Sequence, residues 1–314
     1  MNRRNFVTSS SLVSAGLLSL SPAFASSDNL KNKYSFNLKY APHLGMFKHN
    51  AGDDPIKQLQ FMIDQGFTAF EDNNKKKRDI ITQNKISSFM LKNNMKMGVF
   101  VAHTIYWKEP NLTSGKIDKR NEFLREIKES VEVAKRVNAK WITVVPGHLD
   151  LRLNIDYQTS NVIESLKYAC NILEPNGITM VLEPLNFRNH PGLFLSKSPQ
   201  AYKICKSVDS PSCKILFDIY HQQIEEGNLI PNIEACWDEI AYFQIGDNPG
   251  RKEPSTGEIN YKNIFKYIHD KGFDGVLGME HGNSKPNKQG EIAVSYTHLR
   301  AHETKANLVC RLLL

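Results

Sequence analysis

The sequence predicts an α/β fold, a single (β/α)8 barrel. Three observations lead to this prediction. Short apolar runs alternate with longer amphipathic ones, glycine recurs in the turns between them, and 314 residues are enough for one barrel of about 250 residues. No linker or low-complexity segment divides the chain, so we expect one barrel domain over residues 36–293.

Eight runs have the length and the β-branched or apolar composition of buried parallel strands. They are Asn37–Ala41, Thr68–Glu71, Lys96–Ala102, Trp141–Pro146, Thr179–Glu183, Lys214–Asp218, Ala241–Gly246 and Gly275–Glu280. Amphipathic helices are expected between them, most clearly over Ile56–Gln65, Asp118–Val137 and Asn161–Leu173. In the third helix one face carries a row of apolar side chains, namely Val162, Leu166, Ala169 and Ile172.

Glycines mark the ends of three expected helices. Gly66, Gly177 and Gly272 each stand just after a helical stretch and just before a strand. A residue in the left-handed conformation commonly ends a helix there, and glycine adopts it without steric cost. These turns support the division of the chain into βα units.

The first 25 residues are expected to be a cleavable export signal. Arg3 and Arg4 precede a weakly apolar stretch over 13–20, and the small-residue sequence Ala23-Phe24-Ala25 follows. Paired arginines before a modest apolar stretch resemble the twin-arginine type, which predicts a periplasmic protein without stable membrane association after cleavage. The alternative is an ordinary secretory signal with a chance arginine pair.

The other end of the chain is expected to be non-native. Residues 294–304 resemble the translation of a transposase adapter used in sequencing libraries, so 294–314 is interpreted as a foreign tail. This tail would replace most of the eighth helix, which should begin near Gln289. The alternative is a genuine C-terminal helix, because the leucines of the tail have helical spacing.

The net charge indicates no nucleic-acid partner. Of the formal charge of +7, +2 comes from Arg3 and Arg4 and +2 from the expected tail, which leaves +3 for residues 26–293. So small an excess does not predict a nucleic-acid surface. The cysteines of the barrel show no CxxC or Cys/His pattern that would predict zinc.

Oxygen-bearing side chains stand at the ends of four consecutive expected strands. They are Glu183, Asp218, Gln244 and Glu280. Functional residues of α/β barrels lie at the carboxyl ends of the strands, so we expect these four side chains to share one rim. Three carboxylates that close together repel one another unless they are protonated or hold a cation. Oxygen ligands favour a hard divalent ion, so the sequence predicts Mg²⁺ or Mn²⁺.

Three segments of this rim carry a resemblance to a known family. Residues 183–186, 217–223 and above all 244–261 are similar to the hydroxypyruvate isomerase family, which belongs to the xylose-isomerase-like TIM barrels. The resemblance covers approximately residues 40–293. It implies that Glu183, Asp218, Gln244 and Glu280 coordinate the metal, and it places His221 and Arg251 beside the substrate.

Two departures separate this chain from the related ketose epimerases. Those enzymes usually carry His as the strand-7 ligand, where this chain has Gln244. They also carry an acidic residue shortly after the strand-5 glutamate, where this chain has Phe187-Arg188-Asn189. Both departures favour the hydroxypyruvate branch.

The resemblance implies an isomerase that converts hydroxypyruvate to tartronate semialdehyde through an enediolate, which the metal would stabilise. We hypothesise that Glu183 and Glu280 are the catalytic acid and base that move the proton between neighbouring carbons. Arg251 would bind the substrate carboxylate with two parallel hydrogen bonds.

Weaker candidates follow the first four strands. His43, Glu71, His103 and His148 would face the same rim, and Trp107 could line an apolar wall of the pocket. Of these, His103 and Trp107 are named as substrate-binding candidates. The alternative for each is local hydrogen bonding or packing.

Other functions remain open beside the first. One is a 3-epimerase or isomerase of a larger or modified sugar, which export would make plausible, and another is a non-catalytic sugar-binding barrel. A nuclease is disfavoured, because related endonucleases bind three zinc ions through many histidines and need a basic face. We expect a small hydroxy-oxo acid or a sugar as the substrate, and the sequence leaves a homo-oligomer open.

Overall fold

The computed structural model describes residues 36–294. The expected export signal and, apart from Val294, the expected foreign tail lie outside the described residues. Within the described range, no helix is both long enough and apolar enough to cross a bilayer.

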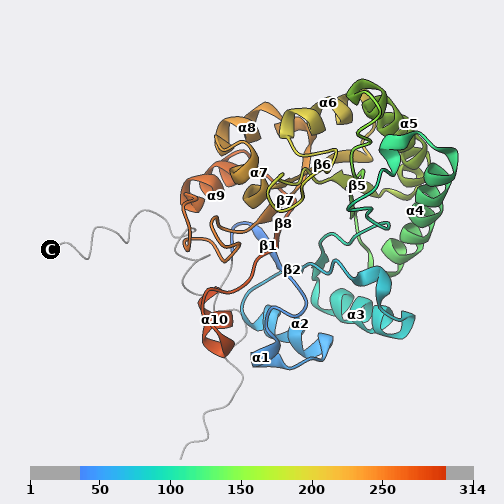
Figure 1. Ribbon diagram of the computed structural model, residues 1–314. Coiled ribbons are helices and arrows are strands. Elements are labelled where there is room, and N and C mark those ends of the chain that lie inside the picture. Colours follow the sequence, from blue (N-terminus) through green and yellow to red (C-terminus); the bar gives the residue numbers. More distant parts are fainter. Residues whose placement is uncertain (1–35, 295–314) are drawn as a thin grey trace, which may run out of the picture. The chain divides into compact units, whose positions relative to one another are not determined.

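All eight expected strands are present (Figure 1). They are β1 (Lys39–Pro42), β2 (Ala69–Phe70), β3 (Lys96–Met97), β4 (Trp141–Val144), β5 (Thr179–Leu182), β6 (Cys213–Asp218), β7 (Ile240–Ile245) and β8 (Val276–Met279). β3 is shorter than the expected Lys96–Ala102, because regular pairing is lost after Met97 and resumes only as a single bridge at Val101.

The strands close into a parallel barrel. Six of them pair in the order β1-β8-β7-β6-β5-β4, and β2 pairs with β3. Two single bridges join the two sheets, from His43 to Glu71 between β1 and β2, and from Val101 to Thr143 between β3 and β4. The ring therefore runs through all eight strands in sequence order, as the prediction of a (β/α)8 barrel requires.

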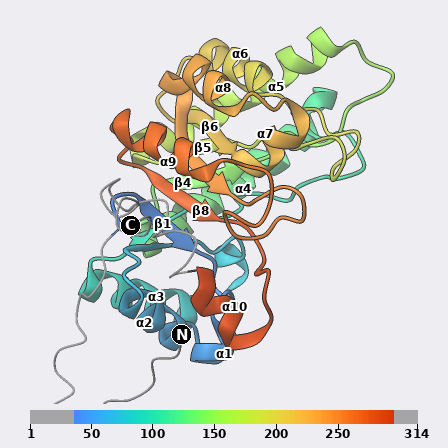
Figure 2. The ribbon, with the colours of Figure 1, turned by 90° about the vertical axis from the view of Figure 1, so that its left-hand side faces the viewer.

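Helices surround the strands, as the views along and across the barrel show (Figures 1 and 2). They are α1 (Lys48–Ala51), α2 (Pro55–Asp64), α3 (Ile80–Asn93), α4 (Ile117–Val137), α5 (Ile155–Leu173), α6 (Ser198–Val208), α7 (Ile219–Glu225), α8 (Leu229–Ala235), α9 (Tyr261–Asp270) and α10 (Asn287–Ala293). The glycines expected to end helices, Gly66, Gly177 and Gly272, all have positive φ, which confirms that prediction.

α5 begins earlier than expected. It starts at Ile155 rather than Asn161, because the Asn154 side chain accepts a hydrogen bond from the Asp156 N–H and caps the helix. Its predicted apolar row, namely Val162, Leu166, Ala169 and Ile172, packs inward, with the first three fully buried. α10 begins at Asn287, close to the expected Gln289.

The core of the described residues has three parts. A large apolar layer lies between strands and helices, a smaller cluster fills the barrel, and a third, of Val145, Leu185 and Leu193, lies beyond the ends of β4 and β5. The cluster that fills the barrel consists of Ala41, Ala69, Val99, Val181, Leu216, Tyr242 and Val276. Apolar packing inside the barrel leaves its two ends as places for polar chemistry.

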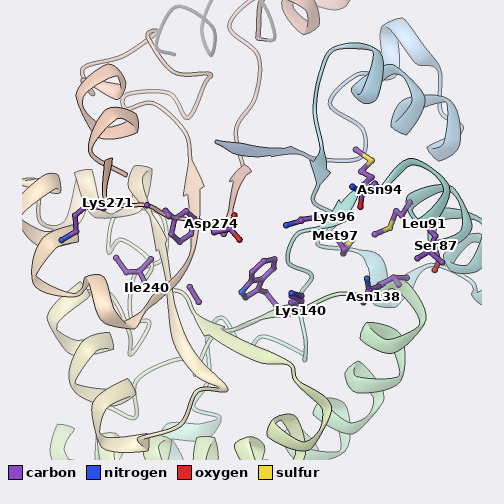
Figure 3. A pocket seen from close by; sticks show the side chains of 18 of the residues that line it. Ser87, Leu91, Asn94, Lys96, Met97, Asn138, Lys140, Ile240, Lys271 and Asp274 are labelled. Atoms are coloured by element: carbon purple, nitrogen blue, oxygen red, sulfur yellow. The ribbon is translucent and has the colours of Figure 1, made fainter. Parts of the chain in front are cut away.

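The amino ends of the strands surround a cavity of about 650 Å³ (Figure 3). Lys96, Trp141, Ile240 and Asp274 line it, at or just before the starts of β3, β4, β7 and β8. The four oxygen-bearing residues singled out from the sequence stand at the opposite, carboxyl ends of their strands. This cavity is therefore not the site that the sequence predicts.

Candidate active site

The four oxygen-bearing side chains share the carboxyl rim of the barrel. Asp218 ends β6 and pairs in register with Gln244 of β7, which in turn pairs with Gly278 of β8. Glu183 directly follows β5, and Glu280 directly follows β8. Because adjacent parallel strands end level with one another, tertiary pairing brings these positions together.

Arg251 links two of the carboxylates. Its Nη2 lies 3.1 Å from Asp218 Oδ2 and 2.9 Å from Glu280 Oε2, and its Nε donates to the Glu280 carbonyl oxygen at 3.0 Å. The guanidinium also lies over the Tyr220 ring, 4.9 Å from its centroid. One positive charge thus faces a group of three carboxyl side chains.

A buried carboxylate holds the Arg251 loop in place. Asp247, just after β7, accepts hydrogen bonds from the N–H groups of Thr256, Gly257 and Ile259 at 2.9–3.1 Å. These bonds join the start of the segment between β7 and α9 to its later part, so that the segment forms a closed loop. The closed loop carries Arg251 to the rim, where its backbone φ of 50° lies in the left-handed region.

The environment raises the pKa of all three carboxyl groups. Burial raises the pKa of Glu183 well above its usual range, and the charges of Glu280 and Asp218 raise it further. Burial also raises the pKa of Asp218, although Arg251 opposes the effect. Glu280 keeps 28% of its side chain exposed, but the enclosing protein still raises its pKa to about 7 against the effect of Arg251.

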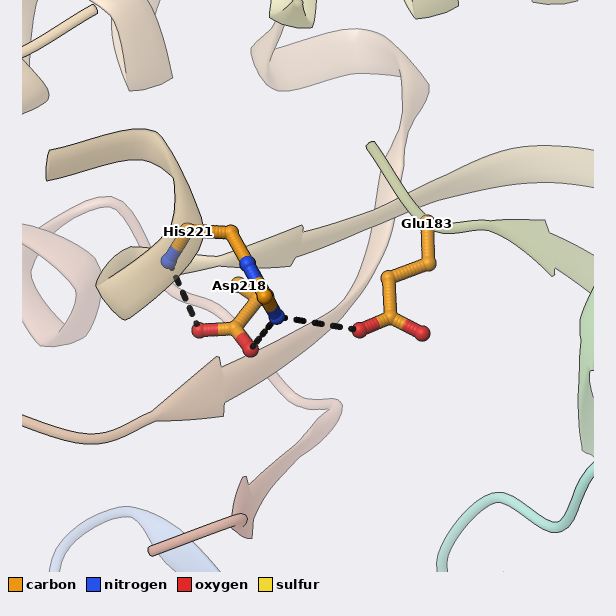
Figure 4. Close-up of side chains that lie close together, drawn as sticks. All are labelled: Glu183, Asp218 and His221. Carbon is orange, nitrogen blue, oxygen red and sulfur yellow. Dashed lines mark hydrogen bonds and ion pairs between the residues drawn. The ribbon is translucent and has the colours of Figure 1, made fainter. Parts of the chain in front are cut away.

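His221 lies between Glu183 and Asp218 (Figure 4). Its Nε2 is 3.6 Å from Asp218 Oδ2 and 4.0 Å from Glu183 Oε1. These three side chains are close enough to hold a metal ion together. However, His221 Nδ1 accepts the backbone N–H of Asn186 at 3.3 Å, and burial lowers the pKa of the ring well below its usual value. The neutral ring then carries its proton on Nε2, which makes that atom a hydrogen-bond donor rather than a ligand.

Gln244 offers an oxygen to the site. Its side-chain nitrogen donates to Glu71 Oε1 at 2.9 Å, whereas its Oε1 is buried without a hydrogen-bond partner among the described residues. A buried amide oxygen without a partner is costly in a protein interior, and a cation would satisfy it.

The donor set suits a hard divalent ion. Glu183, Asp218, Gln244 and Glu280 contribute carboxylate and amide oxygens, the ligands that Mg²⁺ and Mn²⁺ prefer. Three carboxylates against one guanidinium leave an excess of negative charge that a divalent cation would neutralise. These four residues could therefore hold the ion, with His221 beside them as a donor.

The two weaker candidates for substrate binding, His103 and Trp107, have different surroundings. His103 is buried, its Nε2 accepts the Val145 N–H at 3.3 Å, and its ring meets the edge of Phe123. These contacts match the alternative for His103, which was local hydrogen bonding or packing. Trp107 is 45% exposed and stacks on His190, with ring centroids 5.1 Å apart, and His190 lies 5.5 Å from the His221 ring. Trp107 thus connects to the site through an aromatic row.

The sequence did not identify all the residues around this site. His190 and Asn186 follow β5, and Tyr242 lies within β7; none of them was singled out. The Asn189-His190-Pro191-Gly192 sequence after a barrel strand is a signal that could have indicated His190. Tyr242 reads as an ordinary strand residue, and only the closed barrel places its hydroxyl on Glu71.

Comparison with known proteins adds relatives of this chain. It is 34% identical to a hydroxypyruvate isomerase of Escherichia coli K12 over 163 aligned residues. This alignment covers 52% of this chain and 63% of the relative. It is 32% identical to a 2-oxo-tetronate isomerase of Cupriavidus necator over 160 aligned residues, and this alignment covers 51% of this chain and 62% of the relative. The matches therefore span less than two thirds of the length of either relative.

Solved structures share the fold. The crystal structure of the IolI protein with a bound zinc atom superposes with a TM-score of 0.67 at 15% identity, covering 85% of this chain and all of that one. The family model described as "Xylose isomerase-like TIM barrel" matches residues 59–302. The rim geometry, the barrel and this match agree: the chain belongs to the xylose isomerase-like TIM barrel family.

Proposed function

We propose that this protein is an isomerase that depends on a divalent metal and converts hydroxypyruvate to tartronate semialdehyde. The observation that carries the proposal is the meeting of three carboxyl groups, one unpartnered amide oxygen and one arginine at the carboxyl rim. The similarity to proteins named hydroxypyruvate isomerase supports the choice of reaction.

The reaction needs a base and an acid. One carboxylate removes the proton from the hydroxyl-bearing carbon, and a second carboxyl group returns a proton to the neighbouring carbon. The hydroxyl proton passes to the former carbonyl oxygen, so an aldehyde and a new hydroxyl group result. Glu183 and Glu280 come from β5 and β8, on either side of β6 and β7, so they can approach a substrate from different sides. The surroundings raise the pKa of each carboxyl group towards neutral pH, where a group can both accept and donate a proton efficiently.

The other residues bind and orient. A divalent ion held by Glu183, Asp218, Gln244 and Glu280 would act as a Lewis acid toward the substrate oxygens. The His221 Nε2–H would donate to a substrate oxygen from its place between Glu183 and Asp218. Arg251 presents a planar guanidinium that suits a carboxylate, provided that part of it turns from Asp218 and Glu280 to the substrate.

A second candidate function is isomerisation of a longer hydroxy-oxo acid. The relative named 2-oxo-tetronate isomerase matches this chain nearly as well as the first relative does. Trp107 and His190 extend the site outward and could accommodate the extra carbon atoms. Measuring kcat/KM on the two acids and on a panel of ketoses would rank these substrates.

Separate Glu183→Gln and Glu280→Gln variants test the proposal. Each should retain a folded barrel and lose turnover of hydroxypyruvate by several orders of magnitude. The wild type should also exchange the substrate C–H proton with deuterium from solvent, and each variant should fail to do so. Near-normal turnover in both variants, with metal still bound, would contradict the proposal, and unchanged sugar binding in the double variant would favour a non-catalytic barrel.

A further inference from the structure

Another buried carboxylate, Glu71, lies next to the site and takes no part in the chemistry above. It directly follows β2 and is fully buried. Its Oε1 accepts the Gln244 side-chain N–H at 2.9 Å and lies 3.1 Å from His43 Nε2, and its Oε2 accepts the Tyr242 hydroxyl at 2.8 Å. Side chains from the residue after β1 and from β7 thus converge on one carboxyl group.

This contact decides which end of the Gln244 amide faces the rim. Only the oxygen of an amide can bind a cation, because the nitrogen has no free electron pair to offer. If the amide were reversed, two oxygen atoms would stand 2.9 Å apart at Glu71, and they would repel unless a proton lay between them. The Glu71 carboxylate therefore keeps the nitrogen on its side and leaves Oε1 for the site.

Two glycines make room for this arrangement. A Cβ at Gly278 of β8 would overlap Glu71 Oε2 and press on Gln244 Cγ. A Cβ at Gly98, just after β3, would overlap the Tyr242 hydroxyl. The barrel interior thus accommodates Glu71 and Tyr242 only because strands on both sides lack side chains there.

We propose that Glu71 is a positioning residue of the metal site: it holds the Gln244 amide so that its oxygen faces the bound ion. The inference rests on the proposed function, because it presupposes a divalent ion at the rim. Glu71 itself need not touch the ion or the substrate. Outer hydrogen-bond partners of this kind orient ligands in metal sites generally.

Mn²⁺ binding to the metal-free protein, measured by calorimetry without substrate, tests the inference. Glu71→Met removes the acceptor oxygens at similar side-chain length and should weaken Mn²⁺ binding by about 10- to 100-fold, the usual effect of losing such a partner. Tyr242→Phe is the matched control, since it removes the other hydrogen bond to the same carboxylate and leaves the contact with Gln244. Its Mn²⁺ affinity should stay near that of the wild type.

A swapped double variant separates positioning from simple loss of packing. Glu71→Gln combined with Gln244→Glu restores a donor–acceptor pair and puts a carboxylate on β7, so Mn²⁺ affinity should recover to at least the wild-type value. If Glu71→Met does not fold, this double variant decides the question. A folded double variant that binds Mn²⁺ supports the inference, and one that does not bind overturns it.

Two other results would also overturn it. One is unchanged Mn²⁺ affinity in Glu71→Met, and the other is an equal loss of affinity in Tyr242→Phe, which would indicate general damage to the barrel interior. A wild type that binds no Mn²⁺ would overturn the proposed function itself and this inference with it, so the two failures are distinguishable.

Discussion

Removing the Arg251 guanidinium should destabilise the metal-free protein far more than the metal-bound one. Arg251 lies within 3.1 Å of Asp218 and Glu280, and its side chain is 29% exposed. Breaking a buried ion pair costs about 3–5 kcal/mol. The partial exposure places Arg251→Met near the lower end, at roughly 3 kcal/mol. For a barrel of this size that corresponds to a melting temperature lower by roughly 6–12 °C.

A bound ion should reduce the loss of stability that Arg251→Met causes. With Mn²⁺ present, its charge compensates the carboxylates, and the loss should shrink to about 1 kcal/mol, the value of an ordinary hydrogen bond. By thermodynamic linkage the variant must then bind Mn²⁺ more tightly, by roughly 30-fold for a difference of about 2 kcal/mol.

Thermal unfolding in EDTA and in saturating Mn²⁺ measures both quantities. Arg152→Met is a suitable control, because Arg152 is an exposed arginine on the loop between β4 and α5. The control should behave alike in the two conditions. If Arg251→Met lowers the melting temperature equally with and without Mn²⁺, the guanidinium does not compensate the carboxylates that bind the ion, and the reasoning is refuted.

Three further predictions address stability and substrate binding. Burial lowers the pKa of Lys75 from 10.5 to about 8, so between these pH values the unfolded chain binds a proton that the folded chain does not. The free energy of unfolding should therefore rise with pH across that window, by up to about 3 kcal/mol. Urea unfolding from pH 7 to 10 should show this rise in the wild type and in the exposed control Lys85→Met, and a smaller rise in Lys75→Met. Gly278→Ala should cost about 1–3 kcal/mol by overpacking and should weaken Mn²⁺ binding, because the new methyl group displaces Glu71; unchanged calorimetric affinity would contradict this. Trp107→Ala should raise KM for the substrate and leave kcat nearly unchanged, whereas a fall in kcat alone would place Trp107 in the chemistry rather than in binding.

Local patterns were sufficient to predict the barrel. Alternation of short apolar runs with amphipathic stretches predicted every strand, and glycine turns predicted where helices end. Two element boundaries differ from the prediction. α5 began earlier because a capping side chain, Asn154, acts locally, and β3 ended earlier because pairing depends on neighbouring strands. Cap signals can be read in a sequence, whereas strand pairing cannot.

The sequence by itself determined which oxygen-bearing side chains stand at strand ends, because a residue's place along its strand depends on local pattern alone. The tertiary structure decided their partners. Gln244 meets Glu71, and Arg251 meets Asp218, only after the ring of strands has closed and the loop after β7 has folded back. Those contacts join residues more than thirty positions apart, and closure of the barrel, not local conformation, sets their distances.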